Sequence, residues 1–193
     1  SRDATVAITS VKTDPLEIQP GQDGKITITV TNNAPTTLTD LNMKLYLYNP
    51  SGSTTIDLPF APVNSATEIR KAQLNPQQSM DFEYTLRAYP DATSKIYKIP
   101  FVLTYYDILG NQKNKTDVIG VVVNSVPDVI SAIDKTDLSQ QKKTGSVTLK
   151  FINKGLNDIK FLNVQIEKSE NYNLLSTTDT TYIGNLVSDD YQT

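Results

Sequence analysis

The sequence contains no cysteine and no histidine among its 193 residues. Without cysteine there are no disulfides, no thiolate metal ligands and no cysteine nucleophile. Without histidine the chain lacks the most frequent general base and the most frequent zinc ligand. These absences argue against an enzyme, and we expect no cofactor and no resident metal.

The sequence also lacks a strong excess of charge of one sign and a long apolar run. The formal net charge is −3, and basic and acidic residues are nearly balanced both in residues 1–124 and in residues 125–193. No basic stripe could follow the phosphates of a nucleic acid, so nucleic acid is not an expected partner. No stretch approaches the roughly 20 apolar residues that span a bilayer. Any membrane association is therefore expected to come from an anchor outside this sequence.

What the chain does contain is a regular alternation of apolar and polar residues. Ile26, Ile28 and Val30 are separated by threonines, and residues 41–48 alternate in the same way. A period of two predicts half-buried strands of an antiparallel sheet. Turn-forming residues recur about every ten positions, as in all-β sandwiches. No amphipathic helix is predicted, although the irregular segment 61–71 is expected to hold a short helical turn.

One strand pattern occurs twice. Residues 24–32, Gly-Lys-Ile-Thr-Ile-Thr-Val-Thr-Asn, return at 145–153 as Gly-Ser-Val-Thr-Leu-Lys-Phe-Ile-Asn, and the same offset carries 41–45 onto 162–166. A repeat held over two strands and their connection predicts a duplicated domain. The copies also agree in the phase of the alternation, and a slip of one residue would invert the faces. Val164 is therefore expected to face the core, and Val164→Asp to disrupt the second domain.

The repeat also predicts the domain boundaries. The short, proline-containing segment 124–127 reads as a linker, which gives a first domain at 1–124 and a second at 125–193. Leu74 is followed in the first copy by about 50 residues, enough for about three strands. The matching Leu186 is followed by only seven. We therefore expect the second domain to lack its C-terminal strands, which a longer polypeptide or a strand donated by another chain would supply.

Three segments resemble known repeat proteins. Residues 20–33, Pro-Gly-Gln-Asp-Gly-Lys-Ile-Thr-Ile-Thr-Val-Thr-Asn-Asn, resemble the opening of prokaryotic cell-adhesion-related Ig-like domains. Residues 182–191, Tyr-Ile-Gly-Asn-Leu-Val-Ser-Asp-Asp-Tyr, are similar to a segment of archaeal S-layer-related Ig-like repeats, and 101–111 to the hairpin that closes them. The resemblance implies tandem Ig-like antiparallel β-sandwich domains in an exported, extracellular protein of the cell surface. It supplies no catalytic residues.

Four tyrosines are candidates for a binding surface: Tyr46, Tyr48, Tyr105 and Tyr106. Exposed tyrosines stack on sugar rings or anchor a protein partner. Tyr46 and Tyr48 fall on the strand face opposite the leucines. Alternatively, these rings cover the sheet or touch the neighbouring domain, and Tyr97 or Tyr105 would form a tyrosine corner, which is a structural feature.

Two groups of carboxylates have a possible chemistry and a simpler explanation. Asp189 and Asp190, with Asp179 upstream, would offer oxygen ligands to Ca²⁺, but no Asp-x-Asp-x-Asp-Gly loop is present. Asp81 and Glu83 share a strand face, as the acid pair of a glycoside hydrolase could. We expect both groups to be solvated.

The leading interpretation is a non-catalytic, extracellular structural protein, an S-layer-associated or adhesin-like spacer that associates with copies of itself or with other envelope proteins. The alternative is a carbohydrate- or protein-binding module that uses exposed tyrosines. A third is an accessory domain of a larger secreted enzyme, with the catalysis outside this sequence. Asn114-Lys-Thr is an allowed N-glycosylation sequence in a predicted turn, where a glycan would be accessible.

Overall fold

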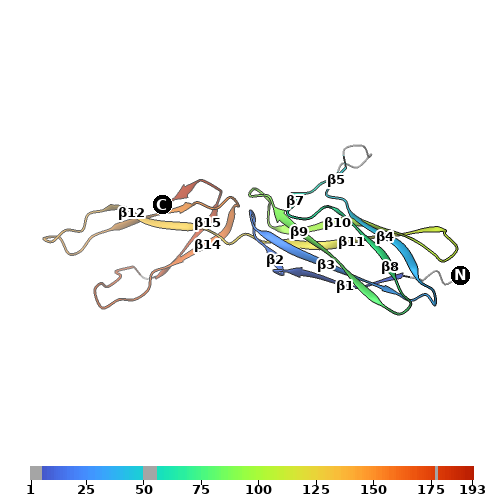
Figure 1. Ribbon diagram of the computed structural model, residues 1–193. Coiled ribbons are helices and arrows are strands. Elements are labelled where there is room, and N and C mark those ends of the chain that lie inside the picture. Colours follow the sequence, from blue (N-terminus) through green and yellow to red (C-terminus); the bar gives the residue numbers. More distant parts are fainter. Residues whose placement is uncertain (1–5, 50–55, 177) are drawn as a thin grey trace. The chain divides into compact units, whose positions relative to one another are not determined.

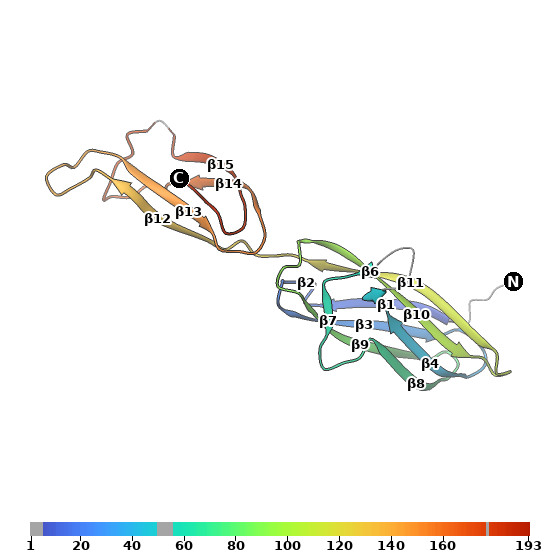
Figure 2. The ribbon, with the colours of Figure 1, turned by 90° about the horizontal axis from the view of Figure 1, so that it is seen from above.

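The computed structural model describes residues 6–49, 56–176 and 178–193. The chain divides into two compact units, Ser1–Ser125 (unit 1) and Val126–Thr193 (unit 2). All regular secondary structure in the described residues is β-strand, which confirms the predicted all-β class (Figures 1 and 2). Accordingly, these residues include no helix that is long and apolar enough to cross a membrane.

Unit 1 is a sandwich of two sheets. The first has the strand order β1-β3-β9-β7 and the second β2-β11-β10-β4-β8. The bounds of the first sheet are β1 (Val6–Asp14), β3 (Asp23–Asn32), β9 (Ser79–Ala88) and β7 (Phe60–Pro62). Those of the second are β2 (Glu17–Ile18), β11 (Gln112–Val123), β10 (Lys95–Tyr106), β4 (Leu38–Leu45) and β8 (Glu68–Leu74). A small additional pair joins β5 (Tyr48–Asn49) to β6 (Ile56–Asp57).

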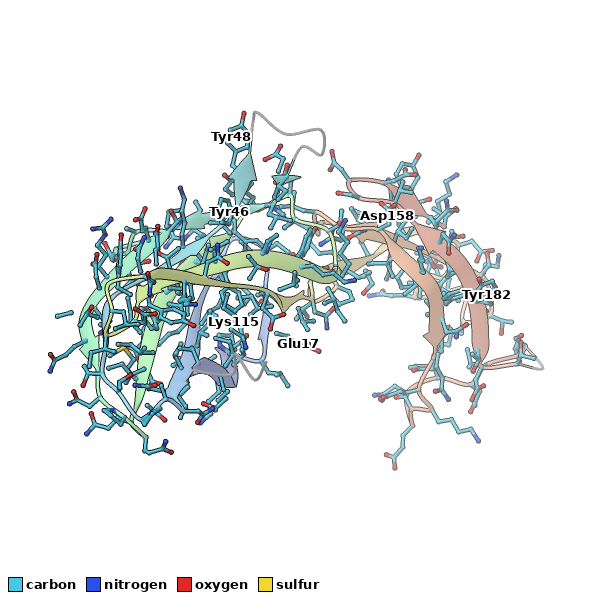
Figure 3. The ribbon with its side chains drawn as sticks, turned by 90° about the vertical axis from the view of Figure 1, so that its right-hand side faces the viewer. Glu17, Tyr46, Tyr48, Lys115, Asp158 and Tyr182 are labelled. Carbon is cyan, nitrogen blue, oxygen red and sulfur yellow. The ribbon has the colours of Figure 1, made fainter. Side chains whose placement is uncertain are left out.

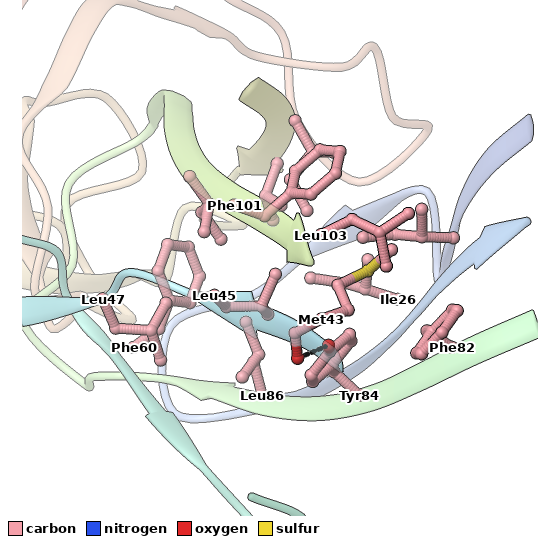
Figure 4. Packing of buried hydrophobic residues seen from close by; sticks show 14 of the residues in the cluster. Ile26, Met43, Leu45, Leu47, Phe60, Phe82, Tyr84, Leu86, Phe101 and Leu103 are labelled. Atoms are coloured by element: carbon pink, nitrogen blue, oxygen red, sulfur yellow. Dashed lines mark hydrogen bonds between the residues drawn. The ribbon is translucent and has the colours of Figure 1, made fainter. Parts of the chain in front are cut away.

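The core of unit 1 lies between these sheets and follows from the alternation in the sequence. The apolar positions of β3 are fully buried, and Ile28 lies opposite Phe82 of β9 in the antiparallel register. Met43 and Leu45 of β4 enter the same core from the second sheet (Figure 4). Removal of this apolar surface from water, at about 25 cal/mol per Å², is the main stabilising contribution. The predicted strand phase is confirmed for β3 and β4.

The hairpin of β10 and β11 is closed by an aspartate. The Asp107 carboxylate accepts hydrogen bonds from the backbone N–H groups of Leu109 and Asn111, both at 2.9 Å. These bonds favour the ionised form and hold the pKa of Asp107 below its usual value. Gly110 has a φ of 79°, a conformation that suits glycine. The turn predicted at this place is therefore present.

A tyrosine corner stands at the start of β10. The Tyr97 hydroxyl donates to the carbonyl oxygen of Thr93, 3.0 Å away and four residues upstream. This is the geometry of the Ig-like tyrosine corner. Of the two residues predicted for this role, Tyr97 therefore fills it.

Residues 61–71 contain no helical turn, and that prediction is wrong. β7 begins at Phe60, and β8 occupies the second half of the segment as an edge strand, with Ile69 opposite Met43 of β4. An edge strand exposes one side to water and tolerates charged residues, so Glu68–Leu74 lacks the alternation of an inner strand. Pairing with β4, rather than its own pattern, makes it a strand.

Unit 2 has two small sheets. The first, of order β12-β13-β16, contains β12 (Val129–Thr136), β13 (Val147–Asn153) and β16 (Tyr191–Gln192). The second pairs β14 (Ile159–Gln165) with β15 (Thr180–Leu186). All of these pairings are antiparallel.

A buried asparagine ends β3 in unit 1 and ties three backbone segments together. The Asn32 side-chain amide donates to the carbonyl oxygens of Thr36 and Leu74, both at 2.9 Å. Its side-chain oxygen accepts from the backbone N–H of Ala34 at 2.8 Å. Asn32 has no exposed surface, so these bonds replace the water that it has lost.

The same network ends β13 in unit 2. The Asn153 amide donates to the carbonyl oxygens of Asn157 at 2.9 Å and Leu186 at 3.0 Å. Its side-chain oxygen accepts from the backbone N–H of Gly155 at 3.0 Å. Asn153 is fully buried as well. The sequence repeat is therefore also a repeat of structure, which aligns β13 with β3 and Leu186 with Leu74.

Backbone conformation repeats too. Asp40 and Phe161 have φ angles of 49° and 60°, and Gln77 and Asp189 have 61° and 59°. Each pair occupies equivalent positions in the two units: the first pair follows Asn32 and Asn153 at the same distance, and the second follows Leu74 and Leu186 at the same distance. These rare conformations are retained in both copies, which fixes the alignment of the strands between them.

Candidate interaction surfaces

A groove lined by aromatic side chains opens at one end of the unit 1 sandwich. Its volume is about 480 Å³, and Tyr46, Tyr48, Phe60 and Tyr89 contribute rings to its lining. The Lys44 ammonium lies 5.4 Å from the centroid of the Tyr46 ring. A cation beside a half-buried ring stabilises its position. The groove thus joins two of the four predicted tyrosines.

The rings of this groove differ in exposure. Tyr48 is 62% exposed and Tyr89 is 43% exposed, whereas Tyr46 is half-buried. Figure 3 shows Tyr48 projecting from the body of unit 1 and Tyr46 lying closer to the sheet. Rings that are exposed before binding are available to a sugar or to a protein side chain. Tyr89 was not predicted from the sequence, because it follows β9 in a connection where no alternation assigns a face.

Tyr105 is not part of a binding surface, and that prediction is wrong. Its side chain is only 5% exposed, because it continues the inward-facing series of Phe101 and Leu103 on β10. Tyr106 points to the other face and is half-buried. It lies six residues beyond Pro100, whose carbonyl oxygen accepts from the Tyr46 N–H. At the usual rise of a strand it is roughly 20 Å from Tyr46 along β10, and the four tyrosines do not form one surface.

Asn114 lies in β11, opposite Thr104 of β10, and not in the turn where it was predicted. The hairpin turn ends before β11 begins at Gln112, because the two strands pair to their tips. Its side chain is exposed. Glycosylation of Asn114 stays a prediction.

Asp81 and Glu83 have separate partners on the outer face of β3 and β9. The Thr29 hydroxyl donates to the Asp81 carboxylate at 2.7 Å, and the Lys25 ammonium lies 2.8 Å from Glu83. Farther along, Arg87 donates two hydrogen bonds to Asp23, at 2.6 and 3.0 Å, and holds the pKa of Asp23 below its usual value. Each carboxylate is thus paired with a hydroxyl or cation across the strands, as expected of a solvated sheet face.

The acids considered for Ca²⁺ lie at opposite ends of β15. Asp179 precedes the strand, and its backbone oxygen accepts from the Ile166 N–H at 2.8 Å. Asp189 and Asp190 follow it, in the turn that leads into β16. Within the part of the chain that the structure describes, no three carboxylates gather closely enough to hold a metal ion.

Unit 2 presents an open apolar face. Its described residues include only one buried hydrophobic side chain, that of Leu186. Val147 is 45% exposed, and Leu149 and Phe151 are partly exposed, whereas their counterparts on β3 are fully buried. The inward positions of β14, including Val164, are also partly exposed. In unit 1 the strands β9 and β10 cover the corresponding positions.

No protein-family model matches the sequence, and no curated protein matches it. Among solved structures, the major pilin subunit BcpA of Bacillus cereus is similar with 9% identity over 96% of this chain and 70% of the pilin, at a TM-score of 0.44. A PapD-like domain of human CEP192 is similar with 12% identity over 62% of this chain and 87% of that domain, at a TM-score of 0.35. Trypsin-activated α2-macroglobulin from Escherichia coli is similar with 14% identity over 69% of this chain, at a TM-score of 0.42, and the match spans only 8% of that protein. With TM-scores below 0.5 and identities below 15%, these similarities assign neither a family nor a role to this chain.

Proposed function

We propose that the protein is a non-catalytic structural module of the cell surface, a spacer built from tandem Ig-like units. The observation that carries the proposal is the duplicated asparagine network of Asn32 and Asn153, which builds the same unit twice. Repetition of one β unit extends a structure without adding a chemical site. The resemblance of the repeats to archaeal S-layer-related and cell-adhesion-related sequences supports an extracellular location.

The surface of unit 1 supports the same proposal. Its carboxylates on the β3–β9 face are held one by one by Thr29, Lys25 and Arg87, so none is set against another acid for catalysis. Such paired, exposed charges contribute solubility and little stability. We infer that this face stays in contact with water. The module associates with copies of itself or with other envelope proteins through its other surfaces.

Labelling of intact cells tests the proposed location. Cells that produce the protein are treated with an amine-reactive reagent that does not cross membranes, and the lysines of this chain are then examined by mass spectrometry. We expect labelling of exposed lysines such as Lys25 and Lys113 before lysis. Labelling that requires lysis, while a known surface protein of the same cells is labelled without it, would contradict the proposal.

A second function is favoured by the groove that Tyr46, Tyr48 and Tyr89 line. Two exposed rings beside a lysine suit a glycan, which binds by stacking its sugar faces on tyrosines. If this groove binds cell-wall polysaccharide, Tyr48→Ala should weaken binding at least about fivefold, because removal of a side chain that is important for binding usually costs at least that much affinity. Tyr182→Ala is the matched control, because Tyr182 of β15 is 60% exposed and lies in unit 2 (Figure 3). Equal binding by wild type and both variants would exclude the groove.

A further inference from the structure

One positive charge stands at the aromatic groove of unit 1. Among the described residues, Lys44 is the only charged side chain that lines this groove. The other lining residues are aromatic or apolar, apart from Thr67 with its hydroxyl group. Lys44 is exposed, and its ammonium lies over the Tyr46 ring, 5.4 Å from the centroid. The groove therefore combines a stacking surface with a single cation.

The Lys44 ammonium has no carboxylate partner in the part of the chain that the structure describes, because none of the ion pairs there includes it. Its neighbour across the strands is Glu68 of β8. The Glu68 carboxylate accepts a hydrogen bond from the Asn42 amide at 2.8 Å and lies 3.8 Å from the Arg70 guanidinium. Because these two groups hold the acid, the charge of Lys44 is available to a ligand.

The backbone that lines the groove is already hydrogen-bonded within unit 1. The Leu45 N–H donates to the carbonyl oxygen of Thr67 at 2.8 Å, and the carbonyl oxygen of Leu47 accepts from the Leu58 N–H at 2.9 Å. An extended polypeptide gains its affinity from main-chain hydrogen bonds to an open strand edge. The backbone groups here are occupied, so the groove favours a ligand that is held by rings and by charge.

Two exposed rings at the groove suit a sugar. Tyr48 and Tyr89 both line it, and both rings are accessible to solvent. A tyrosine ring offers an apolar face on which a pyranose can stack, and its hydroxyl can bond to the sugar. The groove volume of about 480 Å³ lies within the range of about 300–1,000 Å³ that small-ligand sites occupy. A sugar that also carries a carboxylate would use the cation as well as the rings.

We propose that the groove of unit 1 selects an acidic glycan, whose sugar stacks on Tyr48 and whose carboxylate binds the Lys44 ammonium. This deepens the glycan-binding function proposed above and rests on it. A hydrogen bond between an ammonium and a carboxylate is stronger than one between neutral groups. The formal net charge of −3 gives the chain as a whole no attraction for polyanions, so the selection comes from Lys44 at the groove.

The probes that test the selection are short oligomers of galacturonic, glucuronic and mannuronic acid, together with the methyl ester of each. The ester keeps the sugar rings and removes the charge. Binding to the whole chain is measured by titration calorimetry at low ionic strength, where salt screens the contact least. At least one acid should bind about two- to fivefold more tightly than its ester, the range for one exposed charge pair.

Two glutamine variants locate the charge that makes the difference. Lys44→Gln should bind the acid and its ester equally, while its affinity for the ester stays unchanged. Lys12→Gln is the matched control and should keep the preference for the acid. Lys12 is an exposed lysine of β1, and β1 and β7 are the opposite edges of the first sheet. Equal loss of the preference in both variants would show a general effect of net charge and would overturn the proposal.

The remaining outcomes separate the charge selection from glycan binding itself. If the wild type binds acids and esters equally and Tyr48→Ala weakens both, the groove binds glycans and the proposed selection is wrong. Absence of binding to every probe would also overturn the proposal, and the polysaccharide assay with Tyr48→Ala then decides the glycan function separately. Polyglutamate that binds as tightly as the best acid, and equally well to Tyr48→Ala, would show attraction by charge alone and would overturn it as well.

Discussion

The two units share a sequence pattern and a hydrogen-bond network, yet among the residues that the structure describes a closed core is found in unit 1 alone. In unit 1, Ile26, Ile28 and Val30 have no exposed surface. In unit 2, the equivalent Val147 is 45% exposed, although it occupies the same phase of the same strand. Alternation therefore specifies which face of a strand is apolar, whereas burial depends on the strands that cover that face.

The asparagine network behaves differently from the core, because it is complete in both units. Asn32 and Asn153 are fully buried and each makes three hydrogen bonds to the backbone. The partners of Asn153 all lie in the part of the repeat that unit 2 contains. A local network thus survives where a long-range core is open, and the two kinds of interaction should respond differently to matched mutations.

The largest expected difference concerns a charge placed in the core. Met43→Asp should destabilise unit 1 by about 4 kcal/mol or more, because Met43 is fully buried and no partner would satisfy the carboxylate. Val164→Asp, at the equivalent position, should lower the free energy of unfolding of unit 2 by no more than about 1–2 kcal/mol, because water already reaches this side chain. This revises the sequence-based expectation that Val164→Asp disrupts unit 2.

Urea unfolding followed by hydrogen exchange, read separately for peptides of each unit, measures both changes. Met43→Leu and Val164→Ile serve as controls, since they keep an apolar side chain of similar volume. Equal losses in the two aspartate variants would mean that unit 2 has a closed core in solution and that the comparison of the units is wrong.

A smaller effect, of similar size in both units, is expected at the asparagines. Asn32→Ala and Asn153→Ala should each destabilise their own unit by about 2–4 kcal/mol, because each leaves buried backbone groups without partners. Hydrogen exchange of β8 and β15, whose last residues Leu74 and Leu186 bond to the two asparagines, reports the loss. The exposed neighbours Asn33→Ala and Lys154→Ala are the matched controls. A large effect at Asn32 with none at Asn153 would show that the network of unit 2 depends on a closed core.

Much of the fold could be predicted from the sequence because it follows local patterns. The alternation at Ile26–Val30 assigned the inward face of β3, and the recurrence of 24–32 at 145–153 revealed the duplicated strand with its terminal asparagine. The turn between β10 and β11 was visible in Asp107 and Gly110, whose roles depend on neighbouring residues only. β8 was missed, because a charged edge strand becomes a strand through pairing rather than through its own pattern.

The candidate site could be predicted only in part. Tyr46 and Tyr48 were found because residues 41–48 alternate clearly, although in the structure β4 ends at Leu45 and Tyr48 belongs to β5. Tyr105 was assigned to the surface wrongly, since neighbouring tyrosines at the end of β10 must face opposite sides and the sequence does not say which one faces the core. Tyr89 was missed because a connection, not a strand, places it in the groove.

The smallest expected effect concerns Tyr84, which has no counterpart among the described residues of unit 2. Its hydroxyl donates to the carbonyl oxygen of Met43 at 2.9 Å inside the core (Figure 4), and burial, with the nearby charge of Glu68, raises its pKa far above the usual value of 10.0. The fold favours the neutral phenol, so this contribution to stability is complete below pH 10 and is lost as the pH rises from there towards the folded-state pKa.

Tyr84→Phe should destabilise unit 1 by about 1 kcal/mol at pH 7 through the lost hydrogen bond, and should reduce the fall in stability between about pH 10 and 11. Urea unfolding of both proteins at pH 7 to 11 measures this, with the exposed Tyr182→Phe as the control. If Tyr84→Phe and wild type lose stability equally above pH 10, the phenol is ionised in the folded protein and the core of unit 1 is less closed than its burial indicates.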